Sequence, residues 1–300
     1  DKLRKNIDAA EYKHVVLGLI FLKYISDSFE EKHQELLQDE WADAEDRDEY
    51  LAENIFFVPE SARWSHLLNQ AKQTNIGMIV DAAMAAIEPD NPSLKGVLPE
   101  VYARQNLDPT SFGELIDLIG NINLGDAQAR SADVLGHVFE YFLGEFALAE
   151  GKQGGQFYTP KSIVTLLVQM LEPYQGRVFD PCCGSGGMFV QSLHFVERRN
   201  ELLKQLGQNA DEQIDLSVKG QEKTGDTVKL AKMNLFVNGR KGEIQQANTY
   251  EEDPFKSFEK FDFILANPPF NVDEVPVTTV EDDPRFNSYG LPRNKGKKAN

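Results

Sequence analysis

The chain has 300 residues, of which 41% are hydrophobic and 26% charged, a composition typical of a soluble globular protein with room for two domains. It holds no run of 18 apolar residues, which argues against a transmembrane helix. The two cysteines, Cys182 and Cys183, are adjacent, and the five histidines are scattered. This pattern favours a reducing cytoplasm over a disulfide framework or a zinc site.

The net charge of −17 belongs almost wholly to the first half of the chain. Residues 1–150 carry 28 acidic and 12 basic side chains, and residues 151–300 carry 20 and 19. An acidic face of this kind is either a solvated surface or a docking face for a basic partner. Such a chain is a poor general binder of polyanions on its own.

The first half is predicted to be helical. Residues 6–38 place apolar side chains at helical spacing without a proline, and include the stretch "HVVLGLIFLKYI", which lacks a signal-peptide cleavage site. Asp108 and Pro109 precede a second helical pattern, and a helix is expected to begin at Ser131. Alternating strand patterns are almost missing before residue 150. We therefore expect an all-helical N-terminal domain over residues 1–150, followed by a junction at "GKQGGQ".

The second half, residues 151–300, alternates helices and strands. Helices are expected at 160–173, from about 187, and at 224–239; strands are expected at 176–180, 214–220, 242–246 and 260–266. Alternation of this kind predicts a doubly wound, mostly parallel sheet. Such sheets bind ligands at the carboxyl ends of their strands.

Polar residues stand at four of those strand ends. Asp180 precedes the glycine loop "GSGG", which lacks the spacing of a dinucleotide fingerprint or a P-loop. Glu222 and Asn248 end the next two strands, and the final strand is expected to stop at Ala266, before "NPPF". Alone, each could be ordinary turn chemistry; together they indicate one ligand site. A strand-end acid favours a ligand with an amine or hydroxyls over a phosphate.

Three motifs in order, "GQFYTP" (155–160), "DPCCGSGGMF" (180–189) and "NPPF" (267–270), resemble those of amino-directed DNA methyltransferases of the gamma group. The helical half adds "AAEYKHVVLGLIFLKYISDSFEEKH", "NPSLKGVLP" and "DVLGHVFEYFL". With these stretches, nearly the whole chain resembles the modification subunit of type I restriction–modification systems. The resemblance implies a Rossmann-like domain that uses S-adenosylmethionine to methylate adenine N6 in DNA.

The resemblance also assigns roles to single residues. Asn267 and the Pro268 carbonyl would accept from the adenine amine, and Phe270 would stack on the flipped base. The implied catalytic set is Asn267, Pro268, Pro269 and Phe270. The implied cofactor-binding set is Gln156, Phe157, Tyr158, Thr159, Pro160, Asp180, Cys182, Gly184, Ser185, Gly186, Glu222, Asn248 and Thr249. Asn248 departs from the family, which usually has Asp there facing the cofactor adenine.

The family context implies partners: DNA, a specificity subunit, an endonuclease subunit and a second modification subunit. Residues 1–150 would contact partners and DNA, and the chain is expected to be truncated at its C-terminus. Two other functions remain open: methylation of another amine, in RNA or on a protein glutamine, and a non-catalytic scaffold, suggested by Asn248.

Overall fold

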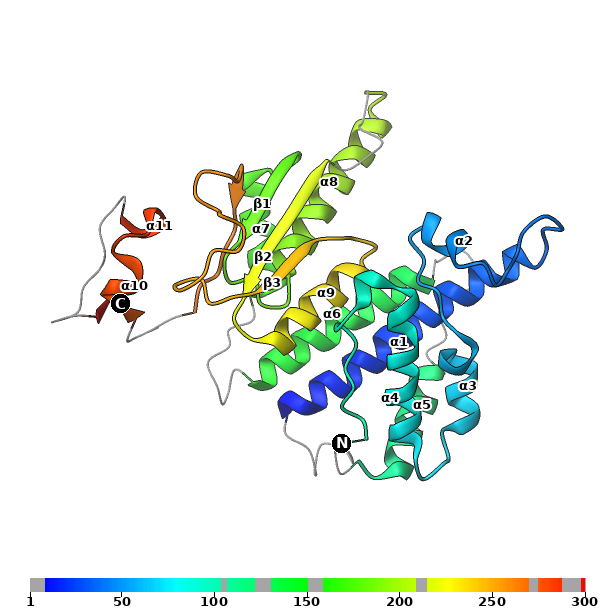
Figure 1. Cartoon of the computed structure of the whole chain (residues 1–300). Coiled ribbons are helices and arrows are strands. Elements are labelled where there is room, and N and C mark those ends of the chain that lie inside the picture. Colours follow the sequence, from blue (N-terminus) through cyan, green and yellow to red (C-terminus); the bar gives the residue numbers. More distant parts are fainter. Residues whose placement is uncertain are drawn as a thin grey trace. The chain divides into compact units, whose positions relative to one another are not determined.

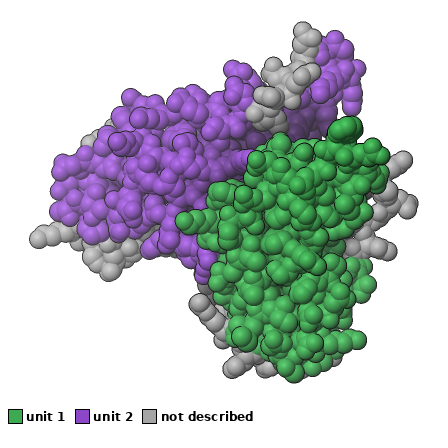
Figure 2. All heavy atoms as spheres, turned by 45° about the vertical axis from the view of Figure 1, so that its right-hand side comes forward, with its two compact units in different colours: residues 1–150 green, residues 151–300 purple. Residues whose placement is uncertain are grey.

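The computed structural model describes residues 9–103, 107–121, 131–150, 159–208, 215–269, 275–287 and 298–299. The chain forms two compact units, residues 1–150 and 151–300, shown in green and purple in Figure 2. No helix within the described ranges is long and apolar enough to cross a membrane.

Unit 1 is built from helices, and its described residues include no strand (Figure 1). The helices are α1 (Ala9–Leu36), α2 (Arg47–Ala52), α3 (Trp64–Gln70), α4 (Ile76–Ile87), α5 (Pro109–Gly120) and α6 (Ser131–Glu150). The described residues also include the 3-10 turns η2 (Glu60–Ala62), η3 (Glu88–Asp90) and η4 (Pro92–Leu94). The prediction that this half is helical is confirmed.

The long helix α1 forms the core of unit 1. Its apolar positions, among them Leu19, Leu22, Ile25 and Phe29, are fully buried, and α6 packs along it. Residues 15–26 of α1 are all buried, and burial of large apolar side chains supplies most of the stability of a helix in a protein. The predicted helix start at residue 108 has a physical basis, because the Asp108 carboxylate accepts from the Ser111 backbone N–H at 2.8 Å.

One glycine allows two elements of unit 1 to approach closely. A β-carbon on Gly113 of α5 would lie 2.2 Å from the backbone carbonyl oxygen of Ala71, just after α3. Real β-carbons do not come this close to backbone oxygen, so the contact between α5 and the end of α3 requires a residue without a side chain.

Unit 2 contains a four-stranded parallel sheet in the order β3-β2-β1-β4. Its strands are β1 (Gly176–Asp180), β2 (Leu216–Glu222), β3 (Glu243–Gln246) and β4 (Phe263–Ile264), and its long helices are α7 (Lys161–Leu171), α8 (Gly187–Gln205) and α9 (Gly225–Val237). Farther along are β5 (Val275–Pro276), α10 (Val277–Val280), α11 (Pro284–Asn287) and β6 (Lys298–Ala299), where β5 and β6 pair antiparallel.

The two faces of the sheet are covered differently. Val178 of β1 belongs to a core that also holds side chains of α7, α8 and α9. The next residue, Phe179, points to the opposite face because side chains alternate along a strand. There its ring stacks on Phe261 and meets the edge of Phe255, both from the segment that connects β3 to β4. The strand order reverses at β1, as in doubly wound folds, and the predicted mostly parallel sheet with helices packed on it is confirmed.

The final strand is shorter than its sequence suggests. The pattern at 260–266 predicts a strand up to Ala266, but β4 ends at Ile264. The Leu265 N–H still donates to the Phe179 carbonyl at 3.0 Å. Beyond that point β1 has ended at Asp180, so Ala266 has no strand beside it to pair with.

Candidate active site at the carboxyl ends of the strands

The four polar residues predicted at strand ends come to the same edge of the sheet. Asp180 and Glu222 are the last residues of β1 and β2. Asn248 follows β3 by two residues, and Asn267 follows β4 by three. All four strands are parallel, so their carboxyl ends face the same way.

The loop between β1 and α8 takes its shape from two glycines with positive φ. Gly184 has φ 52° and Gly186 has φ 77°, conformations that other residues rarely adopt. Gly186 precedes the first residue of α8. The loop is held from outside as well, since the Asn234 side chain of α9 donates to the Ser185 carbonyl at 2.8 Å.

Glu222 connects the tip of β2 to this glycine loop. One carboxylate oxygen accepts from the Gly184 N–H at 3.2 Å and the other from the Thr224 N–H at 2.9 Å. Thr224 is the residue just before α9, so Glu222 also stabilises the start of that helix. Each carboxylate oxygen has two lone pairs, so both retain capacity to accept from a ligand hydroxyl.

Asp180 is a buried acid, 1% exposed. One carboxylate oxygen accepts from the Cys182 N–H at 2.9 Å. Burial, reinforced by the charge of Glu222, outweighs that bond and raises the pKa of Asp180 to about 7. Within the part of the chain that the structure describes, no basic side chain forms an ion pair with it. A cationic or amine-bearing ligand would satisfy this carboxylate.

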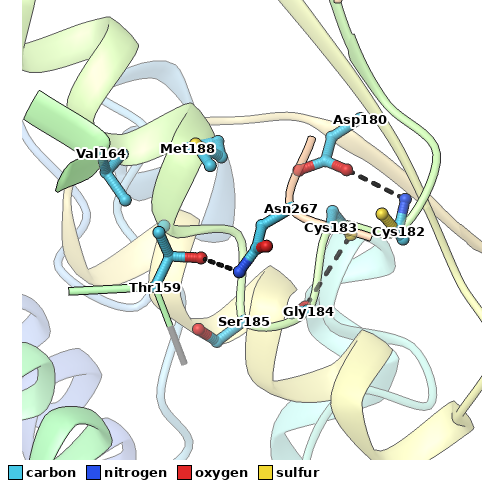
Figure 3. A pocket seen from close by; sticks show the side chains of 10 residues that line it. Thr159, Val164, Asp180, Cys182, Cys183, Gly184, Ser185, Met188 and Asn267 are labelled. Carbon is cyan, nitrogen blue, oxygen red and sulfur yellow. Dashed lines mark hydrogen bonds between the residues drawn. The ribbon is translucent and has the colours of Figure 1, made fainter. Parts of the chain in front are cut away.

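A small cavity of about 80 Å³ opens beside Asp180 (Figure 3). It is lined by Thr159, Val164, Asp180, Cys182, Cys183, Gly184, Ser185, Gly187, Met188 and Asn267. From opposite sides, Thr159 and Asn267 meet in a hydrogen bond of 2.8 Å between the Asn267 amide nitrogen and the Thr159 hydroxyl. The cavity thus combines apolar walls, a buried acid and a side-chain amide.

The structure brings most of the predicted residues to this cavity or next to it. Of the predicted cofactor-binding set, Thr159, Asp180, Cys182, Gly184 and Ser185 line it. Gly186 and Glu222 lie next to the cavity. Gly186 is the last residue of the glycine loop before α8, and Glu222 accepts from the Gly184 N–H of that loop.

Asn248 and Thr249 lie farther along the same edge. The Thr249 hydroxyl donates to the Pro181 carbonyl, which ties the loop after β3 to the start of the glycine loop. The Asn248 side-chain oxygen accepts from the Tyr250 N–H at 3.3 Å. Asn248 therefore shapes its own turn, while its oxygen keeps one further lone pair.

Of the "NPPF" residues, Asn267 lines the cavity, whereas Pro268 and Pro269 are exposed. Pro160 is also exposed, immediately before α7. Gln156, Phe157, Tyr158 and Phe270 lie outside the described residues.

Four cavity residues were not predicted: Val164, Cys183, Gly187 and Met188. Three of them belong to the motif "DPCCGSGGMF", so its full length was a usable signal. Val164 carries no such signal, because a valine at helical spacing in α7 is indistinguishable from an ordinary core residue.

Comparison with known proteins adds two family matches. The model of the N-6 DNA Methylase family matches residues 130–300, and that of the HsdM N-terminal domain matches residues 1–119. The first match starts at the beginning of α6, so it includes the last helix of unit 1.

Curated relatives and solved structures agree with these matches. The MjaIX methylase subunit of a type I restriction enzyme from Methanocaldococcus jannaschii is 38% identical over 95% of this chain and 52% of its own length. The HindI methylase subunit from Haemophilus influenzae is 39% identical over 78% of this chain and 55% of its own. The chain thus spans about half the length of these relatives.

A methyltransferase subunit of a type I restriction–modification system from Streptococcus thermophilus has the same fold, with a TM-score of 0.75 at 22% identity over 99% of this chain and 65% of that one. A modification subunit from Vibrio vulnificus gives a TM-score of 0.61 at 20% identity, over 91% and 59%. The relatives at 38% and 39% identity confirm the resemblance to type I modification subunits. Since its family model covers more than half of the residues, the chain belongs to the N-6 DNA methylase family.

Proposed function

We propose that the chain is the catalytic part of a site-specific DNA methyltransferase, the modification subunit of a type I restriction–modification complex. It transfers a methyl group to the N6 amine of an adenine that has left the duplex. The observation that carries this proposal is the cavity in which Asn267, the first residue of "NPPF", faces the glycine loop and the buried Asp180.

The residues of the cavity fit S-adenosylmethionine as the methyl donor, which supplies an activated methyl group when bound. Asp180 is a buried acid without a cationic partner among the described residues, which suits the amino group of a methionine moiety. Glu222 has spare acceptor capacity for ribose hydroxyls. The Gly184 and Gly186 backbone lets a ligand approach closely.

The "NPPF" loop suits an amine as the acceptor of the methyl group. The lone pair of adenine N6 is delocalised into the ring, so the amine is a weak nucleophile. Two acceptors on its hydrogens, the Asn267 side-chain oxygen and the Pro268 carbonyl, favour a tetrahedral nitrogen whose lone pair is free to attack. Proline donates no N–H of its own. Phe270 would stack on the base. Catalysis then rests on positioning and electrostatics.

The complex would contain further subunits. The relatives named above are methylase subunits of type I restriction enzymes, and by analogy this chain would act with a specificity subunit that reads the DNA sequence. An endonuclease subunit and a second modification subunit would complete the assembly in the cytoplasm. We assign partner and DNA contacts to residues 1–150 and catalysis to residues 151–300.

A transfer assay tests this function. The full-length protein, purified with its specificity subunit, is given S-adenosylmethionine with a labelled methyl group and matched DNA, RNA and protein acceptors. Label in DNA, recovered as N6-methyladenine, is the expected result. Label confined to RNA or protein would identify another amine as the substrate. Cofactor binding that is undetectable by calorimetry would instead favour a non-catalytic scaffold.

A further inference from the structure

Two residues that each precede a proline meet across the cavity. Thr159 stands before Pro160 at the start of α7, and Asn267 stands before Pro268. The ring of a proline clashes with the residue before it when that residue has helical backbone angles, so the preceding residue favours an extended conformation. The hydrogen bond of 2.8 Å between the two side chains therefore joins groups whose backbones are both restrained.

In this hydrogen bond the Asn267 amide is the donor and the Thr159 hydroxyl oxygen is the acceptor. The amide nitrogen points at the Thr159 hydroxyl oxygen, and the amide oxygen points away from it (Figure 3). Among the described residues, Thr159 is the only hydrogen-bond partner of the Asn267 side chain. An amide turned by half a rotation would present its NH₂ group, which has no lone pair to offer an amine.

We infer that Thr159 is a positioning residue for methyl transfer: its hydroxyl oxygen holds the Asn267 amide so that the amide oxygen is the atom offered to the target amine. This inference rests on the proposed function and changes the role of Thr159, which the family resemblance assigns to cofactor contact.

The test is a comparison of variants of the full-length protein, purified with its specificity subunit. Thr159→Val keeps the shape of the side chain and removes the hydroxyl. It should lower kcat at saturating DNA and cofactor about 10- to 100-fold, the scale of a misplaced reacting group. The Kd for S-adenosylmethionine, measured by calorimetry, should stay within about twofold of wild type, because the inferred role lies in the orientation of Asn267.

Two further variants make the test specific. Thr159→Ser retains the hydroxyl and should keep kcat within about threefold of wild type. Thr165→Val is the matched control: it makes the same change on α7 at a threonine that bonds Gln191 and does not line the cavity. It should leave both kcat and the cofactor Kd unchanged.

A double-mutant cycle addresses the coupling itself. Asn267→Asp replaces the amide with a carboxylate, which offers an oxygen in either orientation. In that background Thr159→Val should lower kcat by less than about threefold, because both ends of a carboxylate are oxygens and Thr159 is no longer needed to orient the side chain.

The inference is overturned if Thr159→Val retains wild-type kcat, or if its defect is a raised cofactor Kd that saturating cofactor rescues. It is also overturned if Thr159→Ser folds normally and is as defective as Thr159→Val. If the wild-type complex binds cofactor but transfers no methyl group to DNA, the proposed function fails and the inference falls with it. These outcomes are distinguishable, since only the last concerns the wild-type protein.

Discussion

At the scale of single residues, the burial of Asp180 is the main energetic cost in the site, because a buried carboxylate is costly to ionise. Its pKa is about 7 in the folded chain and 3.8 in an unperturbed state. The folded chain therefore holds one more proton than the unfolded chain between these values, and stability falls as the pH rises through that window. A bound ligand with an amine would stabilise the ionised Asp180 carboxylate. The stability of the folded chain should therefore depend on whether the site is occupied.

Replacing Asp180 with Asn should make this contribution visible. Relative to Asp180→Asn, the wild-type chain should lose up to about 4 kcal/mol in the free energy of unfolding between about pH 4 and pH 8. Denaturation by urea at several pH values measures the difference, in which the many other acids cancel. The variant should also bind S-adenosylmethionine more weakly. A stability difference that does not change with pH would contradict this prediction.

Glu222 and Asn267 show how far sequence reasoning reaches at this scale. Strand ends followed by turn residues identify both positions, because parallel strands deliver their carboxyl ends to one edge. The bond from Asn267 to Thr159 joins residues 108 apart, and only the folded chain defines it. Val164 escaped prediction for the same reason: tertiary packing, not local pattern, turns it toward the cavity.

At the scale of elements, close approach matters more than helix propensity. Gly113→Ala should destabilise unit 1 by about 1–3 kcal/mol, because a β-carbon would press on the Ala71 carbonyl and push α5 away from the end of α3. Asp117→Ala is the control on an exposed position of the same helix, with an expected change within about 0.5 kcal/mol. Chemical denaturation of the full chain measures both. Equal stabilities would show that α5 can shift without loss.

The lengths of elements were predictable where they depend on local chemistry. Asp108 precedes α5 as predicted, and α8 begins directly after the glycine loop. The end of β4 was misjudged by two residues, since it is set by the end of β1 beside it. Strand ends depend on neighbours that a linear pattern does not reveal.

At the scale of the whole molecule, the two units carry different charge and different chemistry. Unit 1 holds nearly all of the net negative charge, while every residue that lines the cavity belongs to unit 2. Deleting residues 1–150 from the full-length protein should therefore abolish co-purification with the specificity subunit. Cofactor binding, measured by calorimetry, should remain within about tenfold of wild type. A folded deletion variant that cannot bind cofactor would show that residues 1–150 are needed to form the cofactor site.

The most direct test of adenine methylation is made in cells that carry the gene. The gene is deleted and restored as wild type or as Asn267→Ala, and genomic N6-methyladenine is mapped by sequencing. The wild-type gene should restore methylation at one defined sequence motif, and Asn267→Ala should leave that motif unmethylated while the protein remains folded and bound to its partners. A methylation map that is the same with and without the gene, or that Asn267→Ala restores in full, would contradict the proposed function.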